Sequence, residues 1–375
     1  MTTDPVIGVV GLGTMGLGIA QVYAAAGMTV IGFDGHAPAR ATAGDRMRAA
    51  LDRRIAAGKL TAGAQAATLG RFTVAEGTAA LAPCALVIEA IVEDLAAKQA
   101  LFAALETVVD ADAVLATNTS SLPVARIAAG LARPDRCLAL HFFNPVPAMR
   151  LVELAPHAGT SAPALGLARA WTEAAGKVVI DCPDRPGFIV NRCARPFYGE
   201  ALALLQEGRS AAEIDAAMVA AGYPLGPFAL IDLIGADINL AATTGLHAAM
   251  GHHPRYHPFD ALRAQVAKGD LGRKTGRGFV HPGALQTPPA DAAAIALRIE
   301  ATLVNEAHWL LAEGGVTTQG VDTALRLGLN FPRGPFDMLA RHGRAAVLAE
   351  LARLQAAAAP AMVARYLPAP GLEVP

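Results

Sequence analysis

The sequence lacks the charge imbalance and the long apolar runs that mark several common classes of protein. Its 375 residues carry a formal net charge of −1 at pH 7, which gives no electrostatic basis for binding nucleic acid or a membrane surface. Hydrophobic residues make up 53% of the chain, yet no apolar run approaches the roughly 20 residues needed to span a bilayer. We therefore expect a globular protein with neither nucleic-acid nor membrane partners.

Cysteine is scarce, and its spacing fits no metal site. The chain has four cysteines, Cys84, Cys137, Cys182 and Cys193, and none are paired at the spacing of metal ligands. Three of them lie in or beside expected buried strands, where cysteine behaves as a small hydrophobe. The first residues also lack the basic segment of a signal peptide. These absences predict reduced thiols, no bound metal and a cytoplasmic location.

The first half of the chain alternates short apolar runs with helical patterns. A continuous apolar run such as residues 6–10 is typical of a strand buried on both faces. Strands that alternate with helices predict a parallel, doubly wound α/β sheet in residues 1–184. The expected strands are 6–10, 29–33, 84–91, 113–119, 136–142, 150–155 and 177–181, and the expected helices are 15–26, 38–57, 93–109, 123–130 and 161–175.

From residue 189 onward the pattern becomes helical, and it repeats. The segment 214–218 precedes a Gly-Pro-Phe turn at 226–228, and the segment 321–325 precedes a second such turn at 334–336. Two copies of one helical unit, 185–284 and 291–375, explain this pattern. Coincidental turns between unrelated helices are the alternative. The second copy has no Pro-Gly-Phe motif before Asn305, so we expect it to be structural.

A glycine-rich loop joins the first expected strand to the first expected helix. In Gly11-Leu12-Gly13-Thr14-Met15-Gly16, the first glycine permits a tight turn, the second lets the backbone approach a pyrophosphate, and the third allows close packing. The helix N-terminus attracts phosphate. Asp34 ends the second strand, where it can accept hydrogen bonds from ribose hydroxyls and repel a 2′-phosphate. These features predict a Rossmann-like domain that binds NAD rather than NADP through Gly11, Gly13, Thr14, Met15, Gly16 and Asp34. A glycine turn without a cofactor is the alternative.

Three polar residues stand at the ends of apolar runs in the same half. His141 and Glu153 lie on neighbouring expected strands joined by a short turn, and Ser120 follows another strand. Ligands of open α/β sheets bind at the carboxyl ends of the strands. A neutral imidazole is the natural base near pH 7, and a carboxylate can orient it. Taken alone, His141 is more often a structural histidine, and Ser120 can be a helix cap.

Five motifs in this order resemble the NAD-dependent L-3-hydroxyacyl-CoA dehydrogenases of fatty-acid β-oxidation. The motifs cover nearly the whole chain. They are Gly-Leu-Gly-Thr-Met-Gly at 11–16, Glu-Ala-Ile-Val-Glu-Asp at 89–94, Thr-Asn-Thr-Ser-Ser at 117–121, His-Phe-Phe-Asn-Pro at 141–145 and Pro-Gly-Phe-Ile-Val-Asn-Arg at 186–192. The resemblance implies a Rossmann-like α/β domain followed by an all-α C-terminal domain, here present twice.

The resemblance also implies roles for particular residues. His141 would be the general acid/base and Glu153 its partner. Ser120 would hydrogen-bond the 3-oxygen of the substrate, and Asn191 would complete the site from the second domain. On the cofactor side it adds Glu93, Lys98 and Asn144. For Glu93 and Lys98 a plain helix N-terminus and an i,i+4 pair of Asp94 with Lys98 compete with this role.

The implied reaction is the reversible, NAD-dependent oxidation of a (3S)-3-hydroxyacyl-CoA to the 3-oxoacyl-CoA. Coenzyme A phosphates could meet the basic helix that carries Arg46, Arg53 and Arg54, followed by Lys59, although a solvated helix face is equally consistent. One alternative is a β-hydroxyacid dehydrogenase, but that family uses a lysine where this chain offers Asn191 and Arg192. Another is an NAD-binding protein kept for a structural role.

Two departures from the family pattern bear on assembly. Arg185 stands where the family usually has a threonine, which can change the hinge or the acyl pocket. In short family members the helical domain pairs two subunits, and a second copy within one chain can take the partner's place. We expect a monomer with an intrachain pseudo-dimer of the helical copies, with a homodimer as the alternative.

Overall fold

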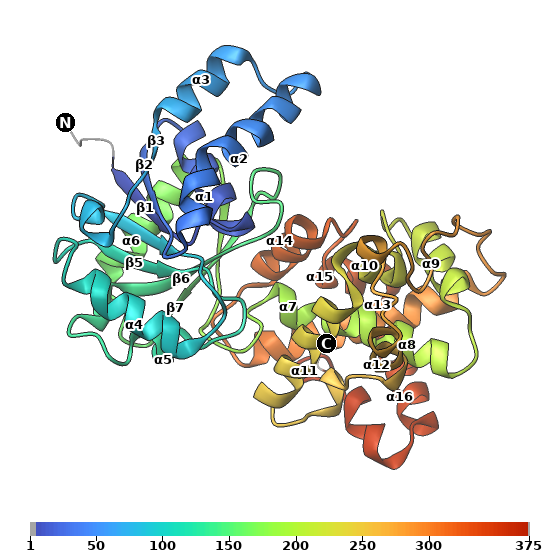
Figure 1. Ribbon diagram of the computed structural model, residues 1–375. Helices are drawn as coiled ribbons and strands as arrows, with labels where there is room; N and C mark the ends of the chain where they lie inside the picture. Colours follow the sequence, from blue (N-terminus) through green and yellow to red (C-terminus); the bar gives the residue numbers. More distant parts are fainter. Residues whose placement is uncertain (1–4, 374–375) are drawn as a thin grey trace. The chain divides into compact units, whose positions relative to one another are not determined.

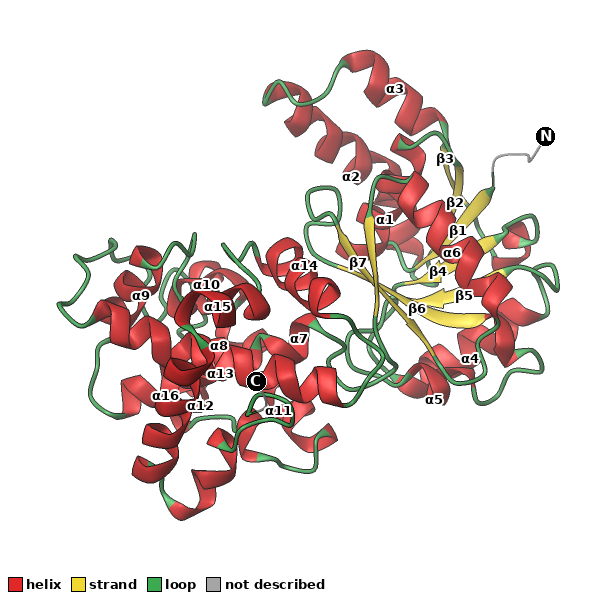
Figure 2. Ribbon diagram, turned by 180° about the vertical axis from the view of Figure 1, so that it is seen from behind, coloured by secondary structure: helices red, strands yellow, loops and turns green. Residues whose placement is uncertain are grey.

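The computed structural model describes residues 5–373 and divides the chain into two compact units, with the boundary between Arg185 and Pro186. The first unit is a β-sheet flanked by helices, and the second unit is helical (Figures 1 and 2). This agrees with the expected change of character near residue 185. Among the described residues no single helix is long and apolar enough to cross a membrane, although the bent pair α10 (Pro227–Ile234) and α11 (Ala236–Ala249) passes by length and composition.

The sheet of the first unit has eight strands in the order β3-β2-β1-β4-β5-β6-β7-β8. The strands are β1 (Val6–Val10), β2 (Thr29–Phe33), β3 (Phe72–Val74), β4 (Leu86–Glu89), β5 (Val114–Thr117), β6 (Cys137–Phe142), β7 (Leu151–Pro156) and β8 (Val178–Asp181). Strands β1 to β6 run parallel, with apolar side chains such as Ile7 and Val9 fully buried in the core.

The expectation of a wholly parallel sheet was wrong at β7, which pairs with β6 in antiparallel fashion. Only residues 143–150 connect the two strands, and a parallel crossover needs a dozen or more residues. Strand β8 then pairs parallel to β7. The reversal matters for the site because it sets β6 residues directly opposite β7 residues.

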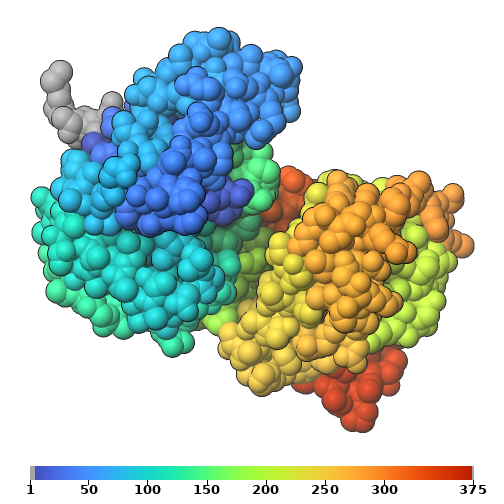
Figure 3. All heavy atoms as spheres, in the orientation of Figure 1, coloured from blue at the N-terminus to red at the C-terminus, as the bar shows by residue number. Residues whose placement is uncertain are grey.

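Helices cover both faces of this sheet (Figure 2). They are α1 (Thr14–Ala25), α2 (Ala37–Ala56), α3 (Ala62–Gly70), η1 (Thr78–Leu81), α4 (Leu95–Glu106), α5 (Val124–Ala128), η2 (Pro134–Arg136) and α6 (Ala162–Ala174). Helix α3 and strand β3 were not predicted. With α2, α3 forms a helical hairpin that projects from the first unit, blue at the top of Figure 3.

The second unit packs its helices around the long helix α13. Its elements are α7 (Val190–Cys193), α8 (Arg195–Gln206), α9 (Ala211–Ala220), α10 (Pro227–Ile234), α11 (Ala236–Ala249), η3 (Pro254–Tyr256), α12 (Asp260–Ala267), η4 (Arg273–Thr275), α13 (Ala292–Ala312), α14 (Thr318–Leu329), α15 (Pro335–His342), α16 (Arg344–Ala357) and η5 (Pro360–Tyr366). Helix α13 contacts α8, α9, α15 and α16.

Buried ion pairs join the two halves of this second unit, which correspond to the two expected helical copies. Arg192 donates from Nε to Glu306 at 2.7 Å and from both terminal nitrogens to Glu313 at 2.7 Å. Glu306 is 0% exposed and also accepts from Arg255 and Tyr256. All three donors to Glu306 therefore come from the first half.

The second half returns the same contacts to the first. Arg298 donates from Nε to Glu200 at 2.7 Å, and its terminal nitrogens bind Glu207. Glu200 is also 0% exposed, and it accepts from Arg365 and Tyr366. This reciprocity supports the prediction of two copies of one helical unit. We call these two sets of contacts the reciprocal clamp.

The repeated Gly-Pro-Phe turns have one structural purpose in both halves. Asp215 accepts hydrogen bonds from the backbone N–H groups of Phe228 and Ala229, at the first turn of α10. Asp322 accepts the corresponding bonds from Phe336 and Asp337, at the first turn of α15. Each aspartate supplies the acceptor that a helix N-terminus requires.

Candidate functional site

The glycine-rich loop has the geometry that a pyrophosphate requires. Gly11 has φ +92°, and a Cβ there would lie 2.5 Å from the carbonyl oxygen of Ala90. A Cβ on Gly16 would lie 1.7 Å from the carbonyl oxygen of Gly11, whereas nothing lies within 4 Å of a Cβ on Gly13. No side chain caps α1, whose N-cap is Gly13. The loop thus turns tightly, packs closely and leaves an approach open beside free helix N–H groups.

Asp34 lies beside this loop, at the end of β2. Its Oδ2 accepts from Leu12 N at 2.7 Å and its Oδ1 from His36 N at 2.8 Å. Thr14 lines the adjoining cleft, whereas the Met15 side chain packs against the core. Any contact of Met15 with a cofactor would therefore come from its backbone.

His141 and Glu153 meet as the sequence predicted. They are direct partners in the antiparallel register of β6 and β7, and His141 Nδ1 lies 2.7 Å from Glu153 Oε2. Glu153 is 0% exposed and His141 is 6% exposed. The ring also packs on Phe143, with 4.6 Å between ring centroids. A buried carboxylate at this distance fixes the orientation of the imidazole.

The Ser120 loop, residues 118–122, follows β5, at the same carboxyl ends of the parallel strands as His141. Glu93 Oε1 accepts from the backbone N–H groups of Ser120 at 3.0 Å and Ser121 at 3.2 Å, and from Thr119 Oγ1 at 2.6 Å. The alternative of Ser120 as a helix cap is wrong, because the N-cap of α5 is Pro123.

Lys98, an expected cofactor-side residue, is buried. It is 1% exposed, and its Nζ lies 2.6 Å from Glu89 and 3.2 Å from Glu93. The alternative of a simple i,i+4 pair with Asp94 is wrong, because Asp94 instead caps α4 by accepting from Ala97 N. Burial alone would raise the pKa of Glu93, but the Thr119 hydrogen bond, the Lys98 charge and the loop donors together lower that pKa.

Asn144 and Asn191 belong to different units. Asn144 follows β6 and lines a cleft in the first unit. Asn191 lies in α7 of the second unit, where its carbonyl oxygen accepts from Arg195 Nε at 2.9 Å.

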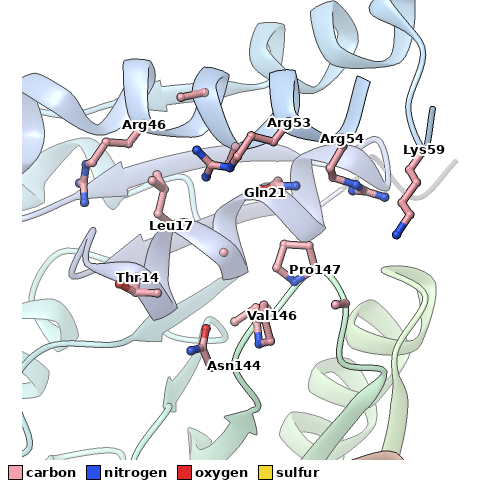
Figure 4. Close-up of a pocket in the computed structure, with 15 residues that line it drawn as sticks. Thr14, Leu17, Gln21, Arg46, Arg53, Arg54, Lys59, Asn144, Val146 and Pro147 are labelled. Atoms are coloured by element: carbon pink, nitrogen blue, oxygen red, sulfur yellow. The ribbon is translucent and has the colours of Figure 1, made fainter. Parts of the chain in front are cut away.

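The cleft beside Asn144 has a volume of about 730 Å³ and lies between α1, α2 and the β6–β7 turn. Figure 4 shows Arg46, Arg53 and Arg54 on one wall, with Asn144 and Pro147 opposite. Lys59 and Thr14 also line it. The basic helix singled out in the sequence thus forms one wall of a cleft.

Three further residues make contacts that shape the site and that were not predicted. Arg46 Nη2 donates to Leu12 O of the glycine-rich loop at 2.6 Å. Lys177 Nζ donates to Val146 O at 2.5 Å and to Met149 O at 2.7 Å, and burial lowers the pKa of Lys177 to about 8. The third, Glu89, is fully buried at the end of β4. Each of these contacts joins residues far apart in the sequence, so no local sequence pattern predicts it.

Comparison with known proteins gives matches over both units. Residues 6–185 match the model of the 3-hydroxyacyl-CoA dehydrogenase NAD binding domain. Residues 187–281 and 295–370 match the model of the 3-hydroxyacyl-CoA dehydrogenase C-terminal domain, in two segments.

Similar proteins carry related names. A 3-hydroxybutyryl-CoA dehydrogenase of Mycobacterium tuberculosis is 42% identical over 73% of this chain and 96% of its own length. A 3-hydroxyadipyl-CoA dehydrogenase of Escherichia coli is 43% identical over 72% of this chain, but the match spans only 58% of that protein. The crystal structure of a 3-hydroxybutyryl-CoA dehydrogenase from Escherichia coli K12 superposes with a TM-score of 0.89 at 32% identity, covering 99% of this chain and 98% of the other.

Proposed function

We propose that His141 and Glu153 are the general acid/base pair of this chain. The chain belongs to the 3-hydroxyacyl-CoA dehydrogenase family of NAD-dependent oxidoreductases. The reaction in this proposal is the reversible oxidation of a (3S)-3-hydroxyacyl-CoA to the 3-oxoacyl-CoA. Bound NAD supplies the hydride acceptor, and the glycine-rich loop with Asp34 has the shape and donors to hold it.

The distance of 2.7 Å between His141 Nδ1 and Glu153 Oε2 carries this proposal. With Glu153 accepting from Nδ1–H, the neutral ring has its lone pair on Nε2, the atom that takes the hydroxyl proton of the substrate. The imidazolium formed is stabilised by a fully buried carboxylate. In the reverse direction the same Nε2–H returns the proton.

Ser120 and Asn191 are proposed to hold the 3-oxygen of the substrate. A hydroxyl and an amide can both donate to an oxygen that gains negative charge during reduction. Glu93 supports this role, because its carboxylate fixes the backbone beside Ser120. For the cofactor side we propose Thr14, Glu93 and Asn144, with Lys98 acting through Glu93.

The basic cleft is proposed to take the phosphates of coenzyme A. Arg53 and Lys59 are exposed on its wall, and phosphate is the ligand that such cations favour. Arg46 Nε is buried without a hydrogen-bond partner among the residues that the structure describes, so an anion there would supply its acceptor.

For assembly we propose a monomer, with domains 1–184, 185–284 and 291–375 and the two helical copies packed as an intrachain pseudo-dimer. The reciprocal clamp supports this, because it resembles the contacts of a two-fold interface. Sedimentation of the pure protein tests it, and a tight dimer joined through the first helical copy would contradict it. A cytoplasmic location remains a prediction.

The direct test follows NADH absorbance with (S)-3-hydroxybutyryl-CoA and NAD. His141→Gln should lower kcat by about 10²–10⁴-fold, since general-base catalysis contributes that much. The matched control is His157→Gln, whose ring binds the Pro134 carbonyl oxygen elsewhere in the first unit. Wild-type turnover in His141→Gln would exclude the base assignment. NADH binding without turnover on any acyl-CoA would instead favour a structural role.

A second assay tests the coenzyme A cleft. Arg53→Ala should raise KM for the CoA thioester but leave KM for NAD unchanged. With the corresponding pantetheine thioester, which lacks the nucleotide phosphates, wild type and variant should behave alike. An equal effect of Arg53→Ala on both thioesters would place the phosphates elsewhere.

A further inference from the structure

Five residues at the carboxyl ends of β4 and β5 form a closed ring of polar contacts, which we call the β4–β5 ring. Glu89 Oε1 accepts from Lys98 Nζ at 2.6 Å, and Glu89 Oε2 accepts from Thr117 Oγ1 at 2.7 Å. Lys98 Nζ also lies 3.2 Å from Glu93 Oε2. Thr119 closes the ring, since its Oγ1 donates to Glu93 at 2.6 Å and its N–H donates to Thr117 Oγ1 at 3.2 Å.

The ring is charged and almost completely buried. Glu89 and Lys98 are 0% and 1% exposed, and Glu93 alone of the five reaches solvent, with 38% of its side chain exposed. Two carboxylates share one ammonium group. Buried charges persist only where partners and hydrogen bonds compensate them, so each member holds its neighbours in place.

Hydrogen bonds attach the Ser120 loop to this ring. Glu93 holds the backbone N–H groups of Ser120 and Ser121, and Thr119 Oγ1 accepts from Leu122 N at 2.9 Å. On the other side, the backbone carbonyl of Glu89 accepts from Asn118 N at 2.8 Å.

The same loop also contacts the strand of the proposed base. Asn118 Oδ1 accepts from the backbone N–H of Phe142, the residue after His141, at 2.8 Å. The ring is therefore hydrogen-bonded directly to Ser120, and the loop that it holds is hydrogen-bonded to Phe142, the neighbour of His141.

We propose that Glu89, which is fully buried, is a positioning residue that sets the place of Ser120 through Lys98 and Glu93. The proposal rests on the function proposed above for Ser120. Its carboxylate fixes the Lys98 ammonium, Lys98 orients Glu93, and Glu93 holds the Ser120 and Ser121 backbone. Removing the Glu89 charge leaves Lys98 with Glu93 alone, which draws Glu93 toward the interior and away from the loop.

The test is a double-mutant cycle of Glu89→Gln with Ser120→Ala. Glu89→Gln should lower kcat by about 10–100-fold and change KM for the CoA thioester little, because small misplacements near reacting atoms have effects of this order. In the Ser120→Ala background the same substitution should have little further effect on kcat. An equal loss in both backgrounds would overturn the proposal, since a merely structural role does not depend on the Ser120 hydroxyl.

A matched control is Glu106→Gln at the other end of α4. Glu106 also holds two backbone N–H groups, those of Ala132 and Arg133, and it pairs with the buried Arg136. It should leave kcat unchanged. An equal loss of kcat in Glu106→Gln would show that any such carboxylate matters equally, and would overturn the assignment to Glu89.

One substitute variant and one binding measurement complete the test. If Glu89→Gln does not fold, Thr117→Val removes two ring hydrogen bonds, the one to Glu89 and the one from Thr119 N, at nearly constant shape. Its smaller loss of kcat should likewise vanish with Ser120→Ala. NADH binding, followed by NADH fluorescence, needs no turnover, and Glu89→Gln should weaken it about tenfold through Glu93. An inactive wild-type protein would refute the proposed function alone. In that case unchanged NADH binding in Glu89→Gln would refute the ring proposal, and weakened binding would support it.

Discussion

Glu306 of the reciprocal clamp gives a prediction whose size follows from the structure. It is 0% exposed and accepts from Arg192 Nε at 2.7 Å, Arg255 Nε at 2.9 Å and Tyr256 Oη at 2.6 Å. Glu306→Gln keeps the shape but leaves two guanidinium groups short of a buried counter-charge. Breaking such a pair costs about 3–5 kcal/mol. For a unit of this size, that corresponds to a fall in Tm of about 6–20 °C.

Urea unfolding followed by circular dichroism measures this free energy. Because the clamp is reciprocal, Glu200→Gln should destabilise by a similar amount. The control is Asp260→Asn at an exposed pair with Arg263, 3.9 Å apart, where we expect at most about 0.5 kcal/mol. A loss below about 1 kcal/mol for Glu306→Gln, or a large loss for Glu200→Gln alone, would refute the reasoning.

Three other predictions concern the first unit. Gly16→Ala should lower Tm, because its Cβ meets Gly11 O at 1.7 Å, whereas Gly13→Ala should fold normally and weaken NADH binding, measured by fluorescence titration. Lys177→Met should raise KM for the CoA thioester in steady-state assays, because the β6–β7 turn that it holds lines the basic cleft. The pKa of Glu93 is lowered from 4.5 in the folded state, so its stabilising contribution is present above pH 4.5 and is lost as pH falls through the folded value. Wild type should therefore lose more stability than Glu93→Gln on acidification, measured by urea unfolding at two pH values.

Much of the first unit could be predicted because its signals are local. A continuous apolar run, three glycines at fixed spacing and Asp34 at the next strand end specify β1, α1 and β2 without any tertiary information. The contact of His141 with Glu153 was also predictable. Their strands are joined by a turn too short for a crossover, and the antiparallel register follows from that length.

What the sequence could not predict depends on tertiary contacts. Lys98 reads as a surface residue at the start of a helix, yet it is buried because Glu89 lies beneath it. Strand β3 has only three residues, Phe72–Val74, so its periodicity is too short to detect. The orientation of β7 was also missed, although the length of its connection indicated it.

The reciprocal clamp also settles how the two helical copies correspond. Arg192, Glu200 and Glu207 have the same spacing as Arg298, Glu306 and Glu313, and the contacts of each set are the same. In this register Leu297, not Asn305, stands at the position of Asn191.

The differences between the copies separate packing from chemistry. The second copy keeps the arginine and the two glutamates of the clamp, and its Asp322 caps α15 as Asp215 caps α10. At the position of Asn191, however, it has an aliphatic side chain that cannot donate to a substrate oxygen. The second copy thus keeps the packing contacts but lacks the amide proposed to bind substrate at Asn191, as expected of a copy retained for packing alone. If so, Leu297→Asn should leave turnover in the NADH assay unchanged, because the nucleotide-binding unit directly precedes the first copy and not the second.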